Sequence, residues 1–281
     1  MSVTVSVKAA PAEIWRALTD RVVVKQWFGN LSSDLLPRAE ARLDFGDGDF
    51  FSIEGVQVDP PYELKYVWRF LGIGPPDSIT WRITPREPGC VVTVTDSEPE
   101  RSSEWARELE TGWLDFTRRL ETFLRTGRPA RYDWSRVFKG NIDLARPAED
   151  MWGALFAPGA QKEWLPLNGA DLQAGRESTL GDDLTPNRFR VSNVVWEAPR
   201  SVSFRLTCEE WLNRTKCYLE LSPCRSGSRL SVSHTGWDAI SLSAEDQLRQ
   251  RKRFSAHWIK ALQSASQIAE GACKRNVSDD F

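Results

Sequence analysis

The sequence contains few of the side chains and motifs that proteins use for proton transfer or metal binding. It contains two histidines, His234 and His257, and its five cysteines include no C-x-x-C pair. A Ser-His-Asp order, metal-ligand spacing, a Walker loop and a dinucleotide fingerprint are all missing. Because histidine is the side chain best suited to acid–base chemistry near neutral pH, we predict no catalytic residue, no metal site and no cofactor.

The sequence also lacks an excess of either charge, and it lacks a long apolar segment. The chain carries 37 Lys and Arg against 39 Asp and Glu, so nucleic acid is not an expected partner. None of its apolar runs approaches the roughly 18 residues that span a bilayer. The N-terminus "MSVTVSVKAAPAE" alternates like a strand instead of forming a signal peptide, and the odd set of cysteines fits a reducing compartment. We expect a soluble, cytoplasmic protein without a membrane partner.

The chain is rich in aromatic residues, and it is long. Thirteen Trp and thirteen Phe provide large apolar surfaces to pack or to offer to a ligand. A chain of 281 residues is long for one domain. It suits two domains of about 120 to 140 residues, each large enough to bury its own core.

An internal repeat supports that division. The phrase "PAEIWRAL" at 11–18 returns as "PAEDMWGAL" at 147–155, and "KQWF" returns as "KEWL" 137 residues further on. From Phe51 onward the copies match without a gap at a spacing of 138, and the closing segments match Trp113 with Trp258. The gap-free pairs include Phe51 and Phe189, Ile53 and Val191, Pro61 and Pro199, Tyr66 and Phe204, Gly89 and Gly227, Val94 and Val232, and Asp96 and His234.

Both copies predict the same order of elements. An alternating strand leads into a helix that begins at Pro-Ala-Glu, where proline suits the first turn, and a second short helix carries the "QWF" or "EWL" aromatic. The runs "FFSIEGVQV", "ELKYVWRF", "SITWRIT" and "CVVTVTD" have period two and predict antiparallel strands. A long amphipathic helix closes each copy, over 103–125 and about 243–271. The first such helix has one apolar stripe: Trp105, Leu109, Trp113, Phe116, Leu120 and Phe123.

These elements can bury both of their apolar faces if each sheet curls around its long helix. We therefore predict an α+β protein of two tandem helix-grip domains, each a curved antiparallel sheet wrapped around a long C-terminal helix. The first domain is expected over 1–126 and the second over 138–273. A solvated basic linker is expected at 127–137, and a flexible tail at 274–281.

Several motifs resemble a known superfamily. The phrases "PAEIWRAL", "WFG" and "GVQVDPPYELKYVW", with a closing helix that begins near "GW", are similar to the START-like SRPBCC superfamily, of the Bet v 1 type, in its branch of heat-shock-protein ATPase activators. The resemblance covers nearly the whole chain twice and is stronger in the first copy, since Ser192 and Asn193 replace Glu54 and Gly55 in the second. It extends to the self-resistance proteins of enediyne producers, which capture a reactive natural product. The resemblance implies the fold and an interior cavity.

The side chains expected to face such a cavity follow from strand alternation and from the inner stripe of the closing helix. They either pack as an ordinary core or form a wall on which an apolar polycyclic ligand stacks. The candidate ligand-binding residues are Phe204, Leu206, Trp211, Leu219, Val232, His234, Trp258, Leu262, Ala265, Tyr66, Trp68, Trp81 and Trp113.

The two closing helices differ in bulk. Aligning their tryptophans replaces Phe116 with Ala261 and Leu120 with Ala265. Close packing does not tolerate so much missing volume without a guest or a collapse. We therefore predict the larger cavity, and the ligand, in the second domain, with the first mainly a scaffold.

Few ionisable residues are candidates for chemistry. Asp96 and His234 share one strand position. They lie either at a strand end beside solvent or at a cavity mouth, where His234 would serve as acid, base or hydrogen-bond donor. His257 is expected at the surface or with satisfied partners, and the adjacent Glu209 and Glu210 in a solvated hairpin loop.

Three functions remain open. The leading hypothesis is a binding protein for a hydrophobic, polycyclic aromatic natural product or its precursor, for self-resistance or sequestration in antibiotic biosynthesis. The second, which the resemblance also implies, is a polyketide aromatase/cyclase that uses His234, Tyr66, Arg69 or Arg205 in the cavity. The third is a chaperone-type regulator that binds a protein partner through its sheet, which predicts an exposed apolar patch and no sizeable cavity.

Overall fold

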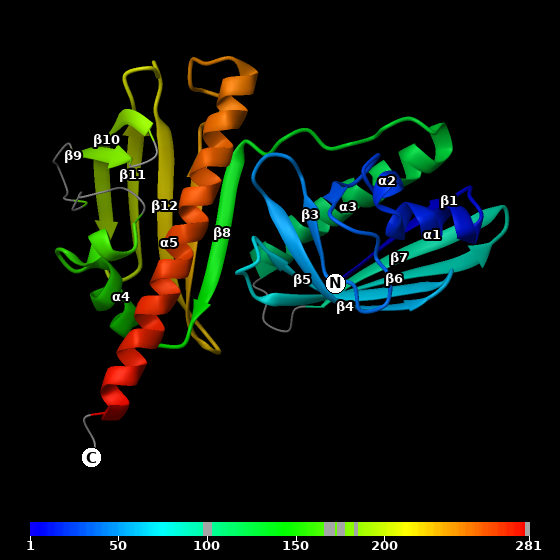
Figure 1. The fold of residues 1–281 in the computed structure, drawn as a ribbon, viewed down its shortest axis with the longest axis horizontal. Coiled ribbons are helices and arrows are strands. Elements are labelled where there is room, and N and C mark those ends of the chain that lie inside the picture. The colour runs from blue at the N-terminus through cyan, green and yellow to red at the C-terminus, as the bar shows by residue number, and fades with distance from the viewer. Residues whose placement is uncertain (98–102, 166–171, 173–177, 183–184, 279–281) are drawn as a thin grey trace. The chain divides into compact units, whose positions relative to one another are not determined.

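The computed structural model describes residues 1–97, 103–165, 172, 178–182 and 185–278. Side chains are not described at 103–106, 108, 178–182, 185–188 and 272–278, so the predicted place of Trp105 in the helix stripe falls outside the described side chains. The chain divides into two compact units, Met1–Trp134 and Ser135–Phe281 (Figure 1).

The first unit is a seven-stranded antiparallel sheet with three helices. The strand order is β1-β7-β6-β5-β4-β3-β2, and the long helix α3 packs against β1 at the sheet edge. Local sequence starts the helices: the Glu13 carboxylate accepts the Ala10 N–H at 2.9 Å, and Asp20 accepts the N–H of Val22 at 2.9 Å. The elements are β1 (Ser2–Val7), α1 (Pro11–Thr19), α2 (Arg21–Val24), β2 (Asn30–Leu31), β3 (Ala41–Asp44), β4 (Phe50–Asp59), β5 (Glu63–Phe70), β6 (Pro76–Arg86), β7 (Gly89–Ser97) and α3 (Ser103–Thr126).

The second unit repeats this plan with six strands. Its strand order is β8-β13-β12-β11-β10-β9, and Figure 1 shows α5 running along one face of that sheet. The elements are β8 (Val137–Leu144), α4 (Ala148–Phe156), η1 (Ala160–Glu163), β9 (Ser178–Asp182), β10 (Thr185–Glu197), β11 (Ser201–Thr207), β12 (Thr215–Cys224), β13 (Gly227–Thr235) and α5 (Ala244–Ser278). The predicted α+β fold of two tandem helix-grip units is therefore confirmed.

Irregular backbone features recur at matched positions of the two units. A β-bulge interrupts the pairing of β4 with β5 after Glu54, and another interrupts β10 with β11 after Ser192. The next residue is left-handed in both cases, with φ of 66° at Gly55 and 53° at Asn193. Glycine and asparagine are the residues that adopt this conformation most readily. The repeat thus preserves local geometry even where the residue types differ.

Four details depart from the sequence-based predictions. The closing helix α5 continues to Ser278, into the segment expected as a flexible tail. The motif tryptophans Trp27 and Trp164 follow the short helices α2 and η1 instead of lying within them. The short strands β2, β3 and β9 were not predicted. Part of the segment expected as a solvated linker contacts the first unit: Ala130 N–H donates to the Gln26 carbonyl at 2.8 Å, and the Tyr132 hydroxyl to the buried Asp47 carboxylate at 2.9 Å.

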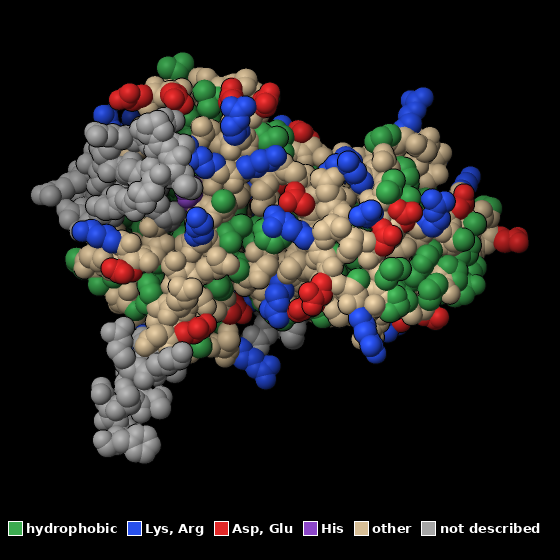
Figure 2. Space-filling model, in the orientation of Figure 1, with side chains coloured by type: hydrophobic (Ala, Val, Ile, Leu, Met, Phe, Trp, Pro, Cys, Tyr) green, Lys and Arg blue, Asp and Glu red, His purple; other side chains and the backbone are tan. Residues whose placement is uncertain are grey.

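Charged side chains of both signs are interspersed on the face shown in Figure 2. Within the described residues, none of the helices is long and apolar enough to cross a bilayer.

Candidate functional site

The predicted inward rows are buried in both units. Tyr66 and Trp68 of β5 alternate with half-buried residues. The matched Phe204 and Leu206 of β11 are buried on either side of the exposed Arg205. All thirteen candidate ligand-binding side chains are at most 4% exposed: Phe204, Leu206, Trp211, Leu219, Val232, His234, Trp258, Leu262, Ala265, Tyr66, Trp68, Trp81 and Trp113. Alternation along a strand was therefore a reliable guide to which side chains point into the fold.

In the first unit, aromatic rings pack on one another. Trp68 stacks on Phe51 with 3.8 Å between ring centroids, and on Trp113 with 5.1 Å. Phe116 adds edge contacts to Phe28 at 4.7 Å. Since both faces of the Trp68 ring are covered by neighbouring rings, this part of the wall serves as core in the structure.

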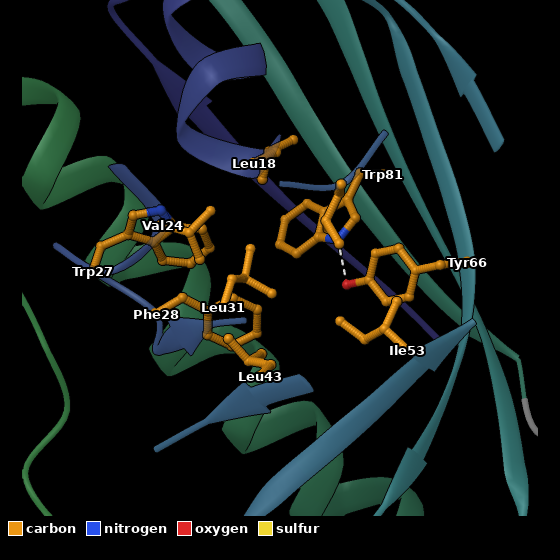
Figure 3. A pocket seen from close by; sticks show the side chains of 10 residues that line it. Leu18, Val24, Trp27, Phe28, Leu31, Leu43, Ile53, Tyr66 and Trp81 are labelled. Atoms are coloured by element: carbon orange, nitrogen blue, oxygen red, sulfur yellow. Dashed lines mark hydrogen bonds between the residues drawn. The ribbon is translucent and has the colours of Figure 1, made fainter. Parts of the chain in front are cut away.

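One cavity of the first unit lies between the short helices and the sheet (Figure 3). Its volume is about 10 Å³, roughly the least that holds a single water molecule. Of the candidate residues, Tyr66 and Trp81 line it. The remaining lining residues were not predicted, although the "KQWF" motif pointed to two of them; they are Leu18, Val24, Trp27, Phe28, Leu31, Leu35, Leu43 and Ile53.

The polar side-chain atoms in that wall are hydrogen-bonded. The Trp27 indole N–H donates to the Ala17 carbonyl at 2.8 Å. The Trp81 indole N–H donates to the Tyr66 hydroxyl oxygen at 3.1 Å, as the dashed line in Figure 3 shows. Burial raises the pKa of Tyr66 above its usual value of 10, so the phenol keeps its proton at neutral pH. The cavity therefore offers a small, almost wholly apolar space.

Asp96 and His234 occupy matched interior positions, and each accepts a hydrogen bond from the matched tryptophan of the closing helix. Trp113 Nε1 donates to Asp96 Oδ2 at 2.8 Å, and Trp258 Nε1 donates to His234 Nδ1 at 3.0 Å. Asp96 is 1% exposed and His234 is fully buried. The expectation that both lie at a strand end beside solvent is wrong, because α3 and α5 cover these positions.

The His234 ring is held as one neutral tautomer. An indole N–H can only donate, so Nδ1 accepts from Trp258 and Nε2 carries the proton. Nε2 lies 2.8 Å from Thr215 Oγ1 and donates to it. Burial, with a further contribution from the positive charge of Arg251, holds the pKa of His234 well below its usual 6.5. With both nitrogens engaged, His234 is part of an internal network and not a side chain at a cavity mouth.

One stripe on the buried face of α5 consists of small residues. Ala261, Ala265 and Ala269 are at most 1% exposed, and they recur every four residues on one buried stripe. The matched residues of α3 are Phe116, Leu120 and Leu124. Two strand positions carry smaller side chains as well: Leu206 and Leu219 stand where the first unit has Trp68 and Trp81.

The aromatic rings of the second unit form two groups, one of Trp152, Phe156, Trp164 and Trp196 and the other around His234. The Phe254 ring lies 5.0 Å from the His234 ring and 5.2 Å from Trp237. Trp211 contacts Trp237 edge-on at 6.0 Å. Of these neighbours only Trp211 was predicted, although Phe254 falls on the buried stripe of the closing helix and could have been found from it.

The other candidate groups are structural. Glu209 and Glu210 are exposed in the loop between β11 and β12, as predicted. His257 is buried and its ring lies 5.8 Å from that of Phe254. Burial raises the pKa of the Cys217 thiol well above its ordinary range, which disfavours the reactive thiolate. Within the described part of the chain, no cluster of three His, Cys, Asp or Glu side chains is placed to hold a metal ion.

Comparison with known proteins identifies the family. The family model described as "Activator of Hsp90 ATPase homolog 1-like protein" matches residues 8–125. DynU16, a protein of the dynemicin biosynthetic locus, is 35% identical over 96% of this chain and 98% of its own, with a TM-score of 0.86. The chain belongs to the same family as DynU16. It is a tandem member of the START-like SRPBCC superfamily, in the branch of the Hsp90 ATPase activators.

More distant structures are similar to this SRPBCC protein as well. The di-domain ARO/CYC protein BexL from the BE-7585A biosynthetic pathway is 13% identical over 96% of this chain and 98% of its own, with a TM-score of 0.38. The Aha1 dimer from Colwellia psychrerythraea is 21% identical over 45% of this chain and 96% of its own, with a TM-score of 0.40. None of the curated proteins compared with the chain matches it.

Proposed function

We propose that this protein binds a hydrophobic, polycyclic aromatic small molecule in the interior of its second unit. The observation that carries the proposal is the buried row Ala261, Ala265 and Ala269 on α5, at positions where the first unit carries phenylalanine or leucine. A row of small side chains on the inner face of a grip helix leaves room for a flat ligand between helix and sheet.

The first unit provides the internal reference. There Phe116, Leu120 and Leu124 occupy the matched positions, and the cavity of about 10 Å³ lies elsewhere, between the short helices and the sheet. Replacing several such side chains with smaller ones removes far more volume than a packed interior leaves empty. Two strand positions of the second unit also carry smaller side chains, since Leu206 and Leu219 replace Trp68 and Trp81.

The chemistry of the interior favours binding over catalysis. The two candidate acid–base groups, His234 and Tyr66, are engaged by Trp258 and Trp81 respectively, and both are held in their neutral forms. Recognition then rests on apolar contact and ring stacking. Kinship with a protein of an antibiotic biosynthetic locus supports sequestration of a natural product, or of its precursor, as the role.

A ligand titration tests the proposal. A panel of polycyclic aromatics, including an anthraquinone and a tetracyclic polyketide, is added while tryptophan fluorescence and the thermal midpoint are followed. A ligand of the native state must raise stability, by about 2.7 kcal/mol at a concentration of 100 Kd. Quenching with a raised midpoint is expected for at least one compound. Unchanged fluorescence and midpoint across the whole panel would refute the binding role.

A pair of variants on α5 locates the site. Ala261→Phe introduces the residue of the first unit into the interior, whereas Ala256→Phe places the same ring on the exposed face of the helix. Ala261→Phe should abolish binding with little change in stability, because the ring fills space meant for the ligand; Ala256→Phe should bind as the wild type does. If Ala261→Phe instead costs the about 1–3 kcal/mol typical of overpacking, the interior is already full.

A further inference from the structure

One buried indole of the second unit differs from the others in its hydrogen bonding. Trp164, Trp196, Trp237 and Trp258 each donate the indole N–H to an acceptor within the unit, at 2.8–3.2 Å. Trp211 is 4% exposed, and its Nε1 has no hydrogen-bond partner among the described residues. An indole N–H can only donate, and a buried donor without an acceptor costs stability. Trp211 therefore holds a donor that an incoming acceptor would satisfy.

The loop that carries Trp211, between β11 and β12, is anchored by hydrogen bonds. The Trp211 backbone N–H donates to the Cys208 carbonyl at 3.0 Å, and the Asn213 side chain donates to the Ala239 carbonyl at 2.7 Å. The unpaired indole N–H is thus not the mark of a loosely attached loop. The next residue, Leu212, is 87% exposed, so Trp211 is buried directly behind the surface of the loop.

Aromatic rings lie around the unpaired N–H. Three rings have centroids 5.6–6.3 Å from that of Trp211, those of Phe189, Trp237 and Phe254. Their interplanar angles with Trp211 are 53–83°, so none of these three stacks on its face. A buried water needs two to four polar partners, and these rings offer it no acceptor. An aromatic ligand with an acceptor oxygen would suit both the rings and the N–H.

The first unit also has an unpaired indole N–H, in a different setting. Trp68 Nε1 has no hydrogen-bond partner among the described residues, and the Trp68 ring is stacked on those of Phe51 and Trp113. Two stacked neighbours offset the cost of that N–H and cover the ring. The counterpart of Trp211 in the first unit is Ile73, so a donor at this position belongs to the second unit alone.

Trp211 also lies near the helix face that carries the alanine row. Phe254, which contacts Trp211, precedes Ala261 by seven residues. Seven residues are two helical turns, so both side chains project from one face of α5, about 10 Å apart along its axis. Both are 1% exposed. The unpaired donor and the row of small side chains are therefore both reached from the inner face of α5.

We propose that the Trp211 indole N–H is the donor by which the second unit recognises its ligand, and that this ligand is a polycyclic aromatic with a carbonyl or hydroxyl oxygen as acceptor. The inference rests on the proposed function and names the class of ligand within it. An aromatic without such an oxygen leaves the N–H unpaired, and a site built to hydrogen-bond its ligand discriminates against an analogue that lacks the bonding group.

Thermal midpoints of two full-length variants test the unpaired state without any ligand. Trp211→Phe removes an indole whose N–H is unused, whereas the control Trp237→Phe removes one whose N–H is bonded to the His234 carbonyl at 3.2 Å. The midpoint should fall less in Trp211→Phe than in Trp237→Phe, because only the control loses a hydrogen bond. An equal fall would mean that the Trp211 N–H is already satisfied, for example by an internal water, and would overturn the proposal.

The binding arm compares anthraquinone with anthracene, which share a three-ring framework and differ in two carbonyl oxygens. Both Kd values are measured by quenching of tryptophan fluorescence. The wild type should prefer anthraquinone, and Trp211→Phe should reduce that preference about tenfold, the effect of one hydrogen bond. Trp237→Phe should leave the preference unchanged. In wild-type protein with labelled indole nitrogens, anthraquinone should move the Trp211 N–H resonance further downfield than anthracene does.

The outcomes separate this inference from the proposed function. If the wild type binds anthraquinone and its preference over anthracene is the same in Trp211→Phe, the binding role stands and Trp211 is not the donor. If both compounds bind more weakly to Trp211→Phe by the same factor, Trp211 only packs against the ligand and the inference is wrong. If the wild type binds no compound of the panel, the proposed function fails and the donor role fails with it.

Discussion

The first unit packs aromatic rings against the inner face of its closing helix, whereas the second has a row of buried alanines at the matched positions. Phe116 of α3 packs into a cluster with Phe28 and Trp113, while its counterpart Ala261 carries only a methyl group. The rings of the second unit form one group around His234 and another of Trp152, Phe156, Trp164 and Trp196. The order of the main strands and the positions of the two bulges are shared. The two copies therefore differ in the side chains that fill the interior and agree in strand order and bulges.

The hydrogen-bonded pairs Trp113–Asp96 and Trp258–His234 also share a position and differ in side-chain chemistry. In each unit an indole N–H from the closing helix needs an acceptor at the last inward position of the neighbouring strand, because an unpaired buried donor is costly. The first unit supplies a carboxylate and the second an imidazole. The requirement is shared and the chemistry that meets it differs.

The largest expected loss of stability comes from adding a side chain at the matched glycines Gly89 and Gly227, where two backbone segments approach closely. A Cβ on Gly227 would lie 2.5 Å from the Leu144 carbonyl oxygen, at a φ of 134°, and one on Gly89 would clash with the Val7 carbonyl oxygen. Backbone atoms cannot move aside, so Gly89→Ala and Gly227→Ala should each destabilise the unit that contains them by more than about 3 kcal/mol. Urea unfolding followed by tryptophan fluorescence measures this loss.

The control for these glycines is Gly153→Ala in α4. Nothing lies within 4 Å of the added methyl group, and alanine is favoured over glycine in a helix by about 0.5–1 kcal/mol. Stability should therefore rise slightly. A loss at Gly153 as large as at Gly227 would mean that the close backbone approach is not the cause.

The next largest loss of stability tests whether the first unit depends on the aromatic rings in its interior. Phe116→Ala gives the first unit the side chain of the second and removes a half-buried ring that contacts Phe28 and Phe45. We expect a loss of about 3 kcal/mol in the free energy of unfolding, the lower end for a core phenylalanine. Denaturant unfolding measures it. A loss under about 1 kcal/mol would show that the first unit does not depend on its rings.

The smallest effect concerns pH. The pKa of His234 is lowered in the folded protein, so below about pH 6.5 the unfolded chain binds a proton that the folded chain does not. Stability of the second unit is complete above that pH and falls as the pH drops towards the lowered pKa, by up to about 1.4 kcal/mol per pH unit. Thermal midpoints measured from pH 8 to pH 5 should show the slope.

His234→Gln is the matched variant for the pH series. Its amide can accept from Trp258 and donate to Thr215 without titrating, so the difference between wild type and variant isolates the histidine. An identical slope in both proteins would exclude His234 as its origin.

Much of the fold follows from local patterns. The run "ELKYVWRF" gave β5 at its observed bounds of Glu63–Phe70, since period-two alternation is a local property. The inward rows followed from the same rule. The place of His234 did not: its partner Trp258 arrives from α5, and no pattern within the strand reveals which helix residue will cover it.

The sequence by itself determined the duplication, the helix-grip fold and the loss of bulk along the second closing helix, because apolar periodicity and repeated motifs are legible residue by residue. The tertiary structure decided the rest. It buried Asp96 and His234 beneath tryptophans, tied Tyr132 to Asp47, and set Gln161 between two backbone groups. These contacts join residues from separate elements, and only the packing of helix against sheet determines which polar atoms meet and which must be satisfied there.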